Sequence, residues 1–305
     1  MKPTNHVLMV RPAIFCANSQ TTETNFFQQA LPFDDAEALV RAQFEFDQLV
    51  AVLQKHGVRV TVYQDSPEPE TPDALFPNNW FVSLPQHQAA LFPMLAPNRR
   101  SERTEAVIAH LEREGHHIAS LTDYTAQEQQ NQFLEGTGSM ILDIPNSLAY
   151  CALSPRSDKQ LFEQFCADHG FTPITFHAYQ SVGKKRMLIY HTNVLMALGS
   201  SFAVVCLDAV DDSAERLYLE DTLKSSGKEI IAISEAQVHQ FAGNMLALTS
   251  NDGNPLMAMS TQAYNALSKH QLYQLSMYAQ PVHSPIPTIE ALGGGGVRCM
   301  MAELY

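Results

Sequence analysis

Three residues far apart in the sequence have side chains that together could carry out covalent catalysis. Cys299 follows four consecutive glycines, His191 begins a polar triplet inside an apolar stretch, and Glu135 precedes a Gly-x-Gly turn. A thiolate can attack an electrophilic carbon, an imidazole can move protons, and a carboxylate can hold a cationic group or share its protons. Because such residues assemble in space, their separation along the chain is no objection.

Cys299 differs from the other cysteines because it comes shortly after a run of four glycines, residues 293–296. Four successive glycines cost backbone entropy in a plain strand, so they indicate a tight loop or a backbone that a ligand approaches closely. A free cysteine is usually a buried structural thiol. We expect that for the cysteines at 16, 151, 166 and 206, which lie in apolar strand or helix patterns. Cys299 is therefore the candidate nucleophile.

The signals at the histidine and the glutamate are weaker. A lone histidine in an apolar strand is more often a hydrogen-bonded core residue, but Thr192 and Asn193 prolong the polar stretch that starts at His191. Each unpaired polar group buried there costs ~1 to 3 kcal/mol, which favours a pocket lining. The carboxylate of Glu135 either points into a cavity or lies at a turn in water. The Gly-x-Gly after it is weak evidence for nucleotide binding, because no helix is expected to follow.

The elements that must position these residues recur along the chain. Four times an amphipathic helix ends at a glycine, the usual left-handed cap, and a strand-like segment follows. The glycines are Gly57, Gly115, Gly170 and Gly227, at spacings of 58, 55 and 57 residues. The expected helices are 38–56, 102–114, 158–169, 213–226 and 261–278, and the strands after them are 58–63, 116–121, 171–176, 229–233 and 280–286.

This periodicity predicts five strand-strand-helix-strand units in one α/β domain, residues 1–305, because no linker interrupts the series. One such unit cannot bury its own apolar face, so the period indicates radial or solenoid repetition. A return of the glycine-rich C-terminal segment to the first strand would close a five-bladed propeller. An ordinary α/β sandwich with evenly spaced helices explains the period equally well.

Composition restricts the class of function. The 305 residues are 45% hydrophobic and 17% charged, as in a globular protein. A net charge of -13 argues against nucleic acid or an anionic membrane as partner and favours a small-molecule substrate. We expect a cytoplasmic protein, since there is no signal peptide pattern, apolar span or Cys-x-x-Cys. We expect no metal or other cofactor, because the candidate site has one histidine rather than a ligand cluster.

Ordered motifs over most of the chain resemble the guanidine-modifying, or pentein, superfamily of arginine deiminases, dimethylarginine dimethylaminohydrolases and amidinotransferases. The citrulline-utilisation hydrolases are the nearest branch. The resemblance implies a five-bladed, pseudo-symmetric α/β propeller of repeated ββαβ units. The motifs are Met9-Val10-Arg11-Pro12, Phe76-Pro77-Asn78-Asn79-Trp80, Leu134-Glu135-Gly136-Thr137-Gly138-Ser139, Ser154-Pro155-Arg156-Ser157, His191-Thr192-Asn193 and the segment 293–300.

The resemblance also implies roles for individual residues. Cys299 would attack the central carbon of a guanidinium or urea, and water would hydrolyse the adduct. His191 would protonate the leaving group and then activate that water, while Glu135 would bind substrate nitrogens. Matching arginines would bind the substrate carboxylate through bidentate hydrogen bonds, although each could instead be a solvated surface charge. These arginines are Arg156, Arg99 and Arg100.

Amides replace carboxylates at family positions expected to contact substrate. Deiminases have Asp where this chain has Asn78-Asn79 and again Asn193. A carboxylate only accepts hydrogen bonds and complements a guanidinium, whereas an amide also donates and complements a neutral urea. Losing a charge-assisted bond costs ~1.5 to 3 kcal/mol. We therefore predict a hydrolase that processes the ureido stage, from citrulline or from an arginine-type guanidine hydrolysed twice, and yields an ornithine-type amine, CO2 and ammonia.

Several alternatives stay open. An amidinotransferase shares the covalent adduct and differs in that an amine, not water, resolves it. A deiminase would stop at citrulline, and acylated or methylated arginines are further substrates. A related propeller that binds ribosomes lacks the nucleophile, so the joint presence of Cys299, His191 and Glu135 argues against a non-catalytic module. A homo-oligomer is compatible with the sequence.

Overall fold

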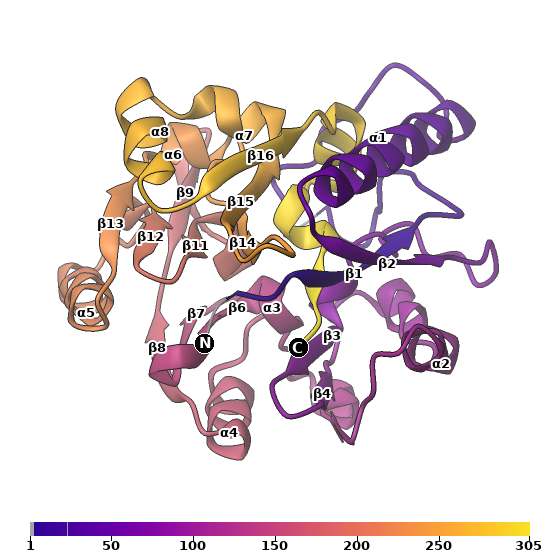
Figure 1. The fold of residues 1–305 in the computed structure, drawn as a ribbon, viewed down its shortest axis with the longest axis horizontal. Coiled ribbons are helices and arrows are strands. Elements are labelled where there is room, and N and C mark those ends of the chain that lie inside the picture. The colour runs from indigo at the N-terminus through magenta and orange to yellow at the C-terminus, as the bar shows by residue number, and fades with distance from the viewer. Residues whose placement is uncertain (1–2, 23) are drawn as a thin grey trace.

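Over residues 3–22 and 24–305, the computed structural model contains five three-stranded sheets with the same internal order (Figure 1). In each sheet the middle strand pairs antiparallel with one neighbour and parallel with the other. A helical segment precedes the parallel strand, which gives the expected ββαβ unit. The five sheets lie around the centre of the molecule, and the longer helices cover the outside (Figure 1).

The strands of the first three sheets are β3 (Phe81–Leu84), β4 (Gln88–Leu91) and β5 (Ser120–Asp123); β6 (Met140–Asp143), β7 (Leu148–Ala152) and β8 (Thr172–Phe176); and β11 (Met196–Leu198), β12 (Phe202–Val205) and β13 (Glu229–Ala232). The other two are β14 (Leu246–Thr249), β15 (Pro255–Ser260) and β16 (Gln280–Ser284); and β17 (Ala302–Glu303), β1 (His6–Arg11) and β2 (Arg59–Gln64). A separate hairpin pairs β9 (Tyr179–Val182) with β10 (Lys185–Leu188).

The two ends of the chain complete one sheet. β1 pairs parallel with β2 on one side and antiparallel with β17 on the other, where Val7 lies opposite Glu303 and Leu8 opposite Ala302. The C-terminal segment therefore returns to the first strand, as expected from the repeat. This pairing places the glycine-rich loop and Cys299 directly before β17, near the centre of the fold.

The helices agree closely with the sequence prediction. Four of the predicted helices were expected to end at a glycine. These glycines, Gly57, Gly115, Gly170 and Gly227, have φ between 74° and 85°, in the left-handed region that such a helix cap requires. Apolar side chains at helical spacing form the buried faces, as with Ala42, Phe46 and Leu49 in the first helix. The helices are α1 (Asp35–Lys55), α2 (Glu105–Arg113), α3 (Gly136–Ser139), α4 (Lys159–His169), α5 (Ser213–Ser225), α6 (Glu235–Val238), α7 (Thr261–Ala266) and α8 (Lys269–Ser276).

Three predicted elements differ from the structure. The strand expected at 116–121 is β5, which starts only at Ser120 and ends at Asp123. The expected helix 261–278 is broken into α7 and α8, because Ser268 forms a capping box with Gln271 and starts a new helix. The apolar stretch 188–196 is not a continuous strand: β10 ends at Leu188, and Thr192–Val194 form a 3-10 turn before β11. The polar triplet therefore occupies a tight turn, where its groups find partners that a strand interior lacks.

Three of the four cysteines expected to be structural, Cys151, Cys166 and Cys206, are buried, and Cys16 is partly buried. Burial raises the pKa of the Cys206 thiol to about 11 and that of Cys166 to about 12, so both are neutral near pH 7. Within the described residues, no helix combines the length and apolar character needed to cross a membrane.

Candidate active site

Five tight turns bring polar side chains to the centre of the fold. In each sheet, one such turn comes before the strand that pairs antiparallel with the middle strand. The turns end at or near Asn79, Ser139, Val194, Asn244 and Met300, and β3, β6, β11, β14 and β17 follow them. The polar residues that they carry lie at positions 79, 135, 191, 244 and 299, which are 53 to 56 residues apart. Repetition of one unit therefore places one polar residue from each unit around a common centre (Figure 1).

A small cavity lies between these turns, with about 270 Å³ of empty space that includes its opening to solvent. Three of the five turn residues, Asn79, His191 and Cys299, line it directly. Its lining is Thr21, Asn25, Asp73, Phe76, Asn79, Arg99, Arg156, Tyr190, His191, Gly293, Gly294, Gly295 and Cys299.

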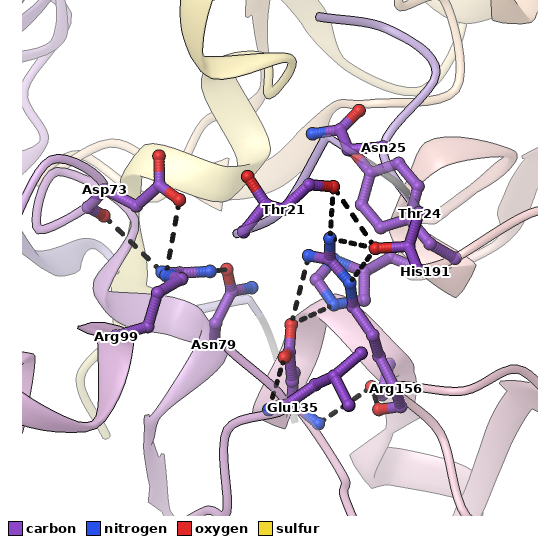
Figure 2. Close-up of polar contacts among 12 residues, drawn as sticks. Thr21, Thr24, Asn25, Asp73, Asn79, Arg99, Glu135, Arg156 and His191 are labelled. Carbon is purple, nitrogen blue, oxygen red and sulfur yellow. Dashed lines mark hydrogen bonds and ion pairs between the residues drawn. The ribbon is translucent and has the colours of Figure 1, made fainter. Parts of the chain in front are cut away.

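Glu135 and His191 form a buried hydrogen-bonded pair (Figure 2). The Glu135 Oε2 atom lies 2.8 Å from His191 Nε2 and 3.5 Å from an Arg156 nitrogen, while the backbone N–H of Leu95 donates to Oε1 at 3.1 Å. Burial opposes ionisation of Glu135, but Arg156 and His191 outweigh it and lower its pKa to about 2. Burial also lowers the pKa of His191 to about 4, despite the carboxylate. Near neutral pH the pair is a carboxylate and a neutral imidazole.

Cys299 is buried, and two side-chain amides contact its sulfur. Asn244 Nδ2 donates to Sγ at 3.3 Å and Asn193 Nδ2 at 3.5 Å. Burial raises the pKa of the thiol, and these two amides together with the charge of Arg298 act in the opposite direction. The side chain of Cys299 is therefore a neutral thiol at rest, and two donors to its anion are already in place.

The glycine loop is held by side chains from other parts of the chain. The Tyr190 hydroxyl donates to the Gly294 carbonyl at 2.7 Å, and Asn25 Nδ2 lies 3.3 Å from the carbonyl oxygens of Gly293 and Gly294. A Cβ atom on Gly295 would lie 2.9 Å from the Phe76 ring. The glycines thus allow the close packing that the sequence predicted for this loop.

Arg156 lies in the cavity wall, where its guanidinium lies among Glu135, Thr21 and Thr24 (Figure 2). Its Nε and Nη2 atoms contact the Thr24 hydroxyl at 3.1 and 2.5 Å, and Nη2 also donates to the Thr21 carbonyl at 3.2 Å. The guanidinium carbon lies 4.8 Å from the centre of the Tyr190 ring. Its Nη1 atom makes only the long contact to Glu135 among the described residues.

Arg99 also lines the cavity, but protein groups occupy most of its donors. Nε and Nη2 bind the Glu102 carboxylate at 2.8 and 2.9 Å, and Nη1 donates to Asn79 Oδ1 at 2.8 Å. Nη2 also lies near the carbonyls of Asp73 and Phe76. The buried guanidinium therefore fixes Asn79 and the segment around Asp73 (Figure 2). Arg99 is therefore not the solvated surface charge that the sequence left open.

The structure does not bring Arg100 to the site. Its Nε donates to the Met94 carbonyl at 3.0 Å and lies 3.4 Å from the Glu128 carboxylate, and a third of the side chain is exposed. The cavity lining does not include it. Arg99 and Arg100 are adjacent in a 3-10 turn, Pro97–Glu102, so their side chains leave the backbone in different directions.

The three asparagines that the sequence indicated, Asn78, Asn79 and Asn193, occupy different places relative to the cavity. Asn79 faces the cavity, whereas Asn78 lies behind it, with Oδ1 accepting from Asn79 Nδ2 at 3.1 Å and its own Nδ2 without a partner in the described part of the chain. Asn193 contacts the sulfur of Cys299 instead of lining the cavity. Asn79 is therefore the one of these three asparagines that lines the cavity.

Sequence reasoning missed two residues of the site. Asp73 is buried in the cavity wall, where Oδ2 accepts from Asn18 at 2.7 Å and Oδ1 has no partner among residues 3–22 and 24–305. It lies in an acidic, proline-rich stretch that reads as an exposed loop. Asn244 has no local motif, although its place between His191 and Cys299 in the 53-to-56-residue series could have identified it. One turn of helix, α3, also follows Glu135, where none was expected.

Gly138 lies against the side chains of both His191 and Asn79. A Cβ atom there would be 2.5 Å from Asn79 Nδ2 and 2.8 Å from the His191 ring. We expect Gly138→Ala to displace both side chains and lower kcat/KM on the true substrate by about 10 to 100-fold, since small displacements of catalytic groups have effects of this size.

The control for Gly138→Ala is Gly170→Ala, where a Cβ atom meets nothing within 4 Å but φ is +74°. The control should lose some stability and keep its turnover number, as measured by steady-state kinetics and thermal unfolding. A Gly138→Ala enzyme with wild-type kcat/KM would show that the two side chains need not hold their observed positions.

The family match and the fold place the chain among the guanidine-modifying enzymes of the pentein superfamily, which have this mixed α/β fold. Residues 11–305 match the family described as N,N dimethylarginine dimethylhydrolase, eukaryotic, and the chain belongs to this family. It is thus a hydrolytic enzyme of the group that acts on guanidino compounds. No curated protein matches the chain.

Several solved structures have the same fold. The substrate-bound N-terminal domain of ArgZ, an arginine dihydrolase of the ornithine-ammonia cycle in cyanobacteria, matches with a TM-score of 0.75 at 15% identity over 98% of both chains. AgrE bound to L-arginine matches with a TM-score of 0.75 at 16% identity, over 98% of this chain and 40% of AgrE. A dimethylarginine dimethylaminohydrolase carrying an S-methyl-L-thiocitrulline adduct matches with a TM-score of 0.63 at 15% identity over 98% of both chains. At these identities the similarity shows the fold.

Proposed function

We propose that this protein hydrolyses the ureido group of a citrulline-type amino acid through a covalent adduct on Cys299. The overall reaction converts the ureido amino acid and one water into an ornithine-type amine, CO2 and ammonia. The observation that carries the proposal is the neutral amide of Asn79 in a cavity that also contains Cys299 and His191. A carboxylate at that place would complement a guanidinium cation, whereas an amide complements an uncharged urea.

We infer that the five sheets act as one catalytic domain, a closed five-bladed propeller of residues 1–305. The pairing of β1 with β17 supports closure, because it joins the last unit to the first. The distribution of site residues also supports one functional unit. Each sheet contributes the turn before the strand that pairs antiparallel with its middle strand. An enzyme built in this way is complete only when all five units are folded.

The charged end of the substrate fits two groups of the cavity. Arg156 would bind the α-carboxylate, with the Thr24 hydroxyl beside it, because its Nη1 atom is the least occupied of its three nitrogens. Asp73 would bind the α-ammonium through its unpartnered Oδ1 atom. Burial raises the pKa of Asp73 in the empty site, and an ammonium group would favour its ionised form. Arg99 would act by holding Asn79 and the Asp73 segment.

The chemical step would begin with a proton transfer inside the active site. The neutral imidazole of His191 would accept the thiol proton of Cys299, and the sulfur electron pair would form the new bond to the ureido carbon. The resulting imidazolium, stabilised by Glu135 at 2.8 Å, would donate its proton to the departing nitrogen as the C–N bond breaks. This leaves a carbamoyl-type thioester on Cys299 and restores the neutral imidazole.

The second half of the reaction would use water as the nucleophile. His191 would accept a proton from that water as it attacks the carbonyl carbon, and the C–S bond would break with the proton returning to the sulfur. The released carbamic acid then decomposes to CO2 and an amine or ammonia. Since a neutral substrate brings no positive charge to the thiolate, the imidazolium must supply it, which explains why Glu135 is held so firmly beside His191.

The preference for urea over guanidinium can be tested by Asn79→Asp. An aspartate would offer charge-assisted bonds worth ~1.5 to 3 kcal/mol to a cation, so we expect the ratio of kcat/KM for arginine to that for citrulline to rise by about 10 to 100-fold. The exposed Asn265→Asp is the control, because it makes the same change in charge outside the cavity. An Asn79→Asp enzyme with the wild-type ratio would contradict the role of the amide.

A further inference from the structure

We propose that Asn244 is a catalytic residue that donates a hydrogen bond to the sulfur of Cys299 and, with Asn193, stabilises the thiolate. The inference rests on the proposed role of Cys299 as nucleophile. It adds a fourth polar residue to the three that the sequence identified, and it assigns a function to the one unit of the fold that otherwise contributes none to the chemistry.

The orientation of the Asn244 amide follows from its partners. The backbone N–H of Arg298 donates to Oδ1 at 3.0 Å, so this atom must be the oxygen. The carbonyl of Asn193 lies 2.9 Å from Nδ2, which must therefore be the nitrogen. One N–H of the amide is thus directed to that carbonyl, and the other is available for the sulfur at 3.3 Å.

The same contacts fix the position of the sulfur. Asn244 binds the backbone of Arg298, the residue before Cys299, and the backbone of Asn193, the second residue that contacts Sγ. It therefore joins the turn before β17 to the turn before β11. The side chain is 2% exposed, so water does not compete for these bonds.

Two glycines permit this arrangement. A Cβ atom on Gly296 would lie 2.7 Å from Asn244 Oδ1, and one on Gly243 would lie 2.3 Å from the Val194 carbonyl. Glycine at both places lets the Asn244 turn approach the nucleophile loop on one side and the turn after His191 on the other. The last glycine of the 293–296 run thus serves the contact between Asn244 and the cysteine loop.

A buried thiol loses the water that would stabilise its thiolate, so hydrogen-bond donors in the protein must replace that water. Burial raises the pKa of Cys299, and hydrogen bonds donated to the charged form lower it. A donor to a charged group changes such an equilibrium by roughly one to two pKa units. The expected contribution of Asn244 is therefore large enough to decide how readily His191 can take the thiol proton.

The test measures the rate at which Cys299 is alkylated by iodoacetamide as a function of pH, in wild type, Asn244→Ala and Asn244→Asp. Mass spectrometry of the peptide that contains Cys299 separates it from the other four cysteines. We expect the midpoint to rise by about one unit or more in Asn244→Ala, and further in Asn244→Asp, which adds a negative charge. The exposed Asn265→Asp should leave the midpoint unchanged.

A second readout separates catalysis from scaffolding. If Asn244 stabilises the thiolate, Asn244→Ala should lower kcat at least tenfold and leave KM within about twofold, with thermal unfolding confirming a folded enzyme. A wild-type alkylation midpoint in the folded Asn244 variants would overturn the inference. Because alkylation needs no substrate, that outcome is distinct from a failure of the proposed function, in which citrulline is not consumed by the wild type.

Discussion

Replacing Cys299 by serine is expected to abolish turnover of every ureido or guanidino substrate, with kcat at least ~10³-fold below wild type. A serine hydroxyl is far less acidic than a thiol, so the neutral imidazole of His191 cannot convert it to a useful nucleophile. The fold should survive, because a hydroxyl can accept the bonds that Asn244 and Asn193 donate to the sulfur. Ammonia release and thermal unfolding measure the two effects.

Cys16→Ser is the matched control for this substitution. Cys16 is partly buried and lies outside the cavity lining, so its replacement should leave kcat within about twofold of wild type. Activity of Cys299→Ser above a tenth of the wild-type value would exclude a covalent role for Cys299. Loss of activity in both variants would point to a general effect of removing a thiol.

The second large effect is expected at His191, where His191→Ala should lower kcat by about 10² to 10⁴-fold. In the proposed mechanism, His191 takes the thiol proton of Cys299 at the start of the reaction and returns a proton to the sulfur at the end. In the folded enzyme the pKa of His191 is lowered to about 4 by burial, and the pKa of the thiol is raised above its usual 9.0. At a pH between these two pKa values, the thiol of Cys299 keeps its proton and the imidazole of His191 is neutral, so one proton is available for transfer between them.

The pH profile of the wild-type enzyme tests this proton count. The quantity to follow is kcat at saturating substrate, where the bound ammonium favours ionised Asp73. Below the lowered pKa of His191 the imidazole is already charged and cannot accept the thiol proton, so kcat should fall on the acid side only near pH 4. Above the raised pKa of Cys299 no proton remains for the leaving group, so kcat should fall again at alkaline pH. An acid limb near pH 6.5, in protein that circular dichroism shows to be folded, would contradict a buried neutral imidazole.

Glu135→Gln gives a second test of the same pair. The carboxylate raises the pKa of His191 against the effect of burial, so its removal should move the acid limb to still lower pH and reduce kcat. The fold is expected to tolerate this change, since glutamine keeps an oxygen to accept from the Leu95 N–H. An acid limb that moves upward would mean that Glu135 does not act on His191 as the structure indicates.

The features of the fold that the sequence predicted are those with local physical causes. Glycine with positive φ ends a helix, and amphipathic helices recur at a fixed interval, so the five units and the helix positions followed directly. The break at Ser268 was missed because its capping box competes with a continuing apolar pattern. The turn at Thr192–Val194 was missed because its flanking residues are as apolar as those of a strand.

The candidate site was predictable to the extent that its residues stand in unusual local settings. Cys299 follows four glycines and His191 starts a polar triplet, whereas Asn244 and Asp73 stand in unremarkable segments and reach the site only through tertiary packing. Arg99 and Arg100 are neighbours in sequence, yet one is buried against Glu102 and the other is partly exposed beside Glu128. No one-dimensional pattern distinguishes them, because side-chain direction within a short 3-10 turn depends on what packs against it.

The central claim is hydrolysis of a ureido group, and mass spectrometry of the products tests it most directly. Purified protein would be incubated separately with citrulline, arginine and dimethylarginine, with and without added glycine or lysine as amidino acceptors. We expect ornithine, CO2 and ammonia from citrulline, with no acceptor adduct. Citrulline that accumulates from arginine or dimethylarginine and is not consumed, an amidino adduct of glycine or lysine, or a citrulline sample left unchanged would contradict the account.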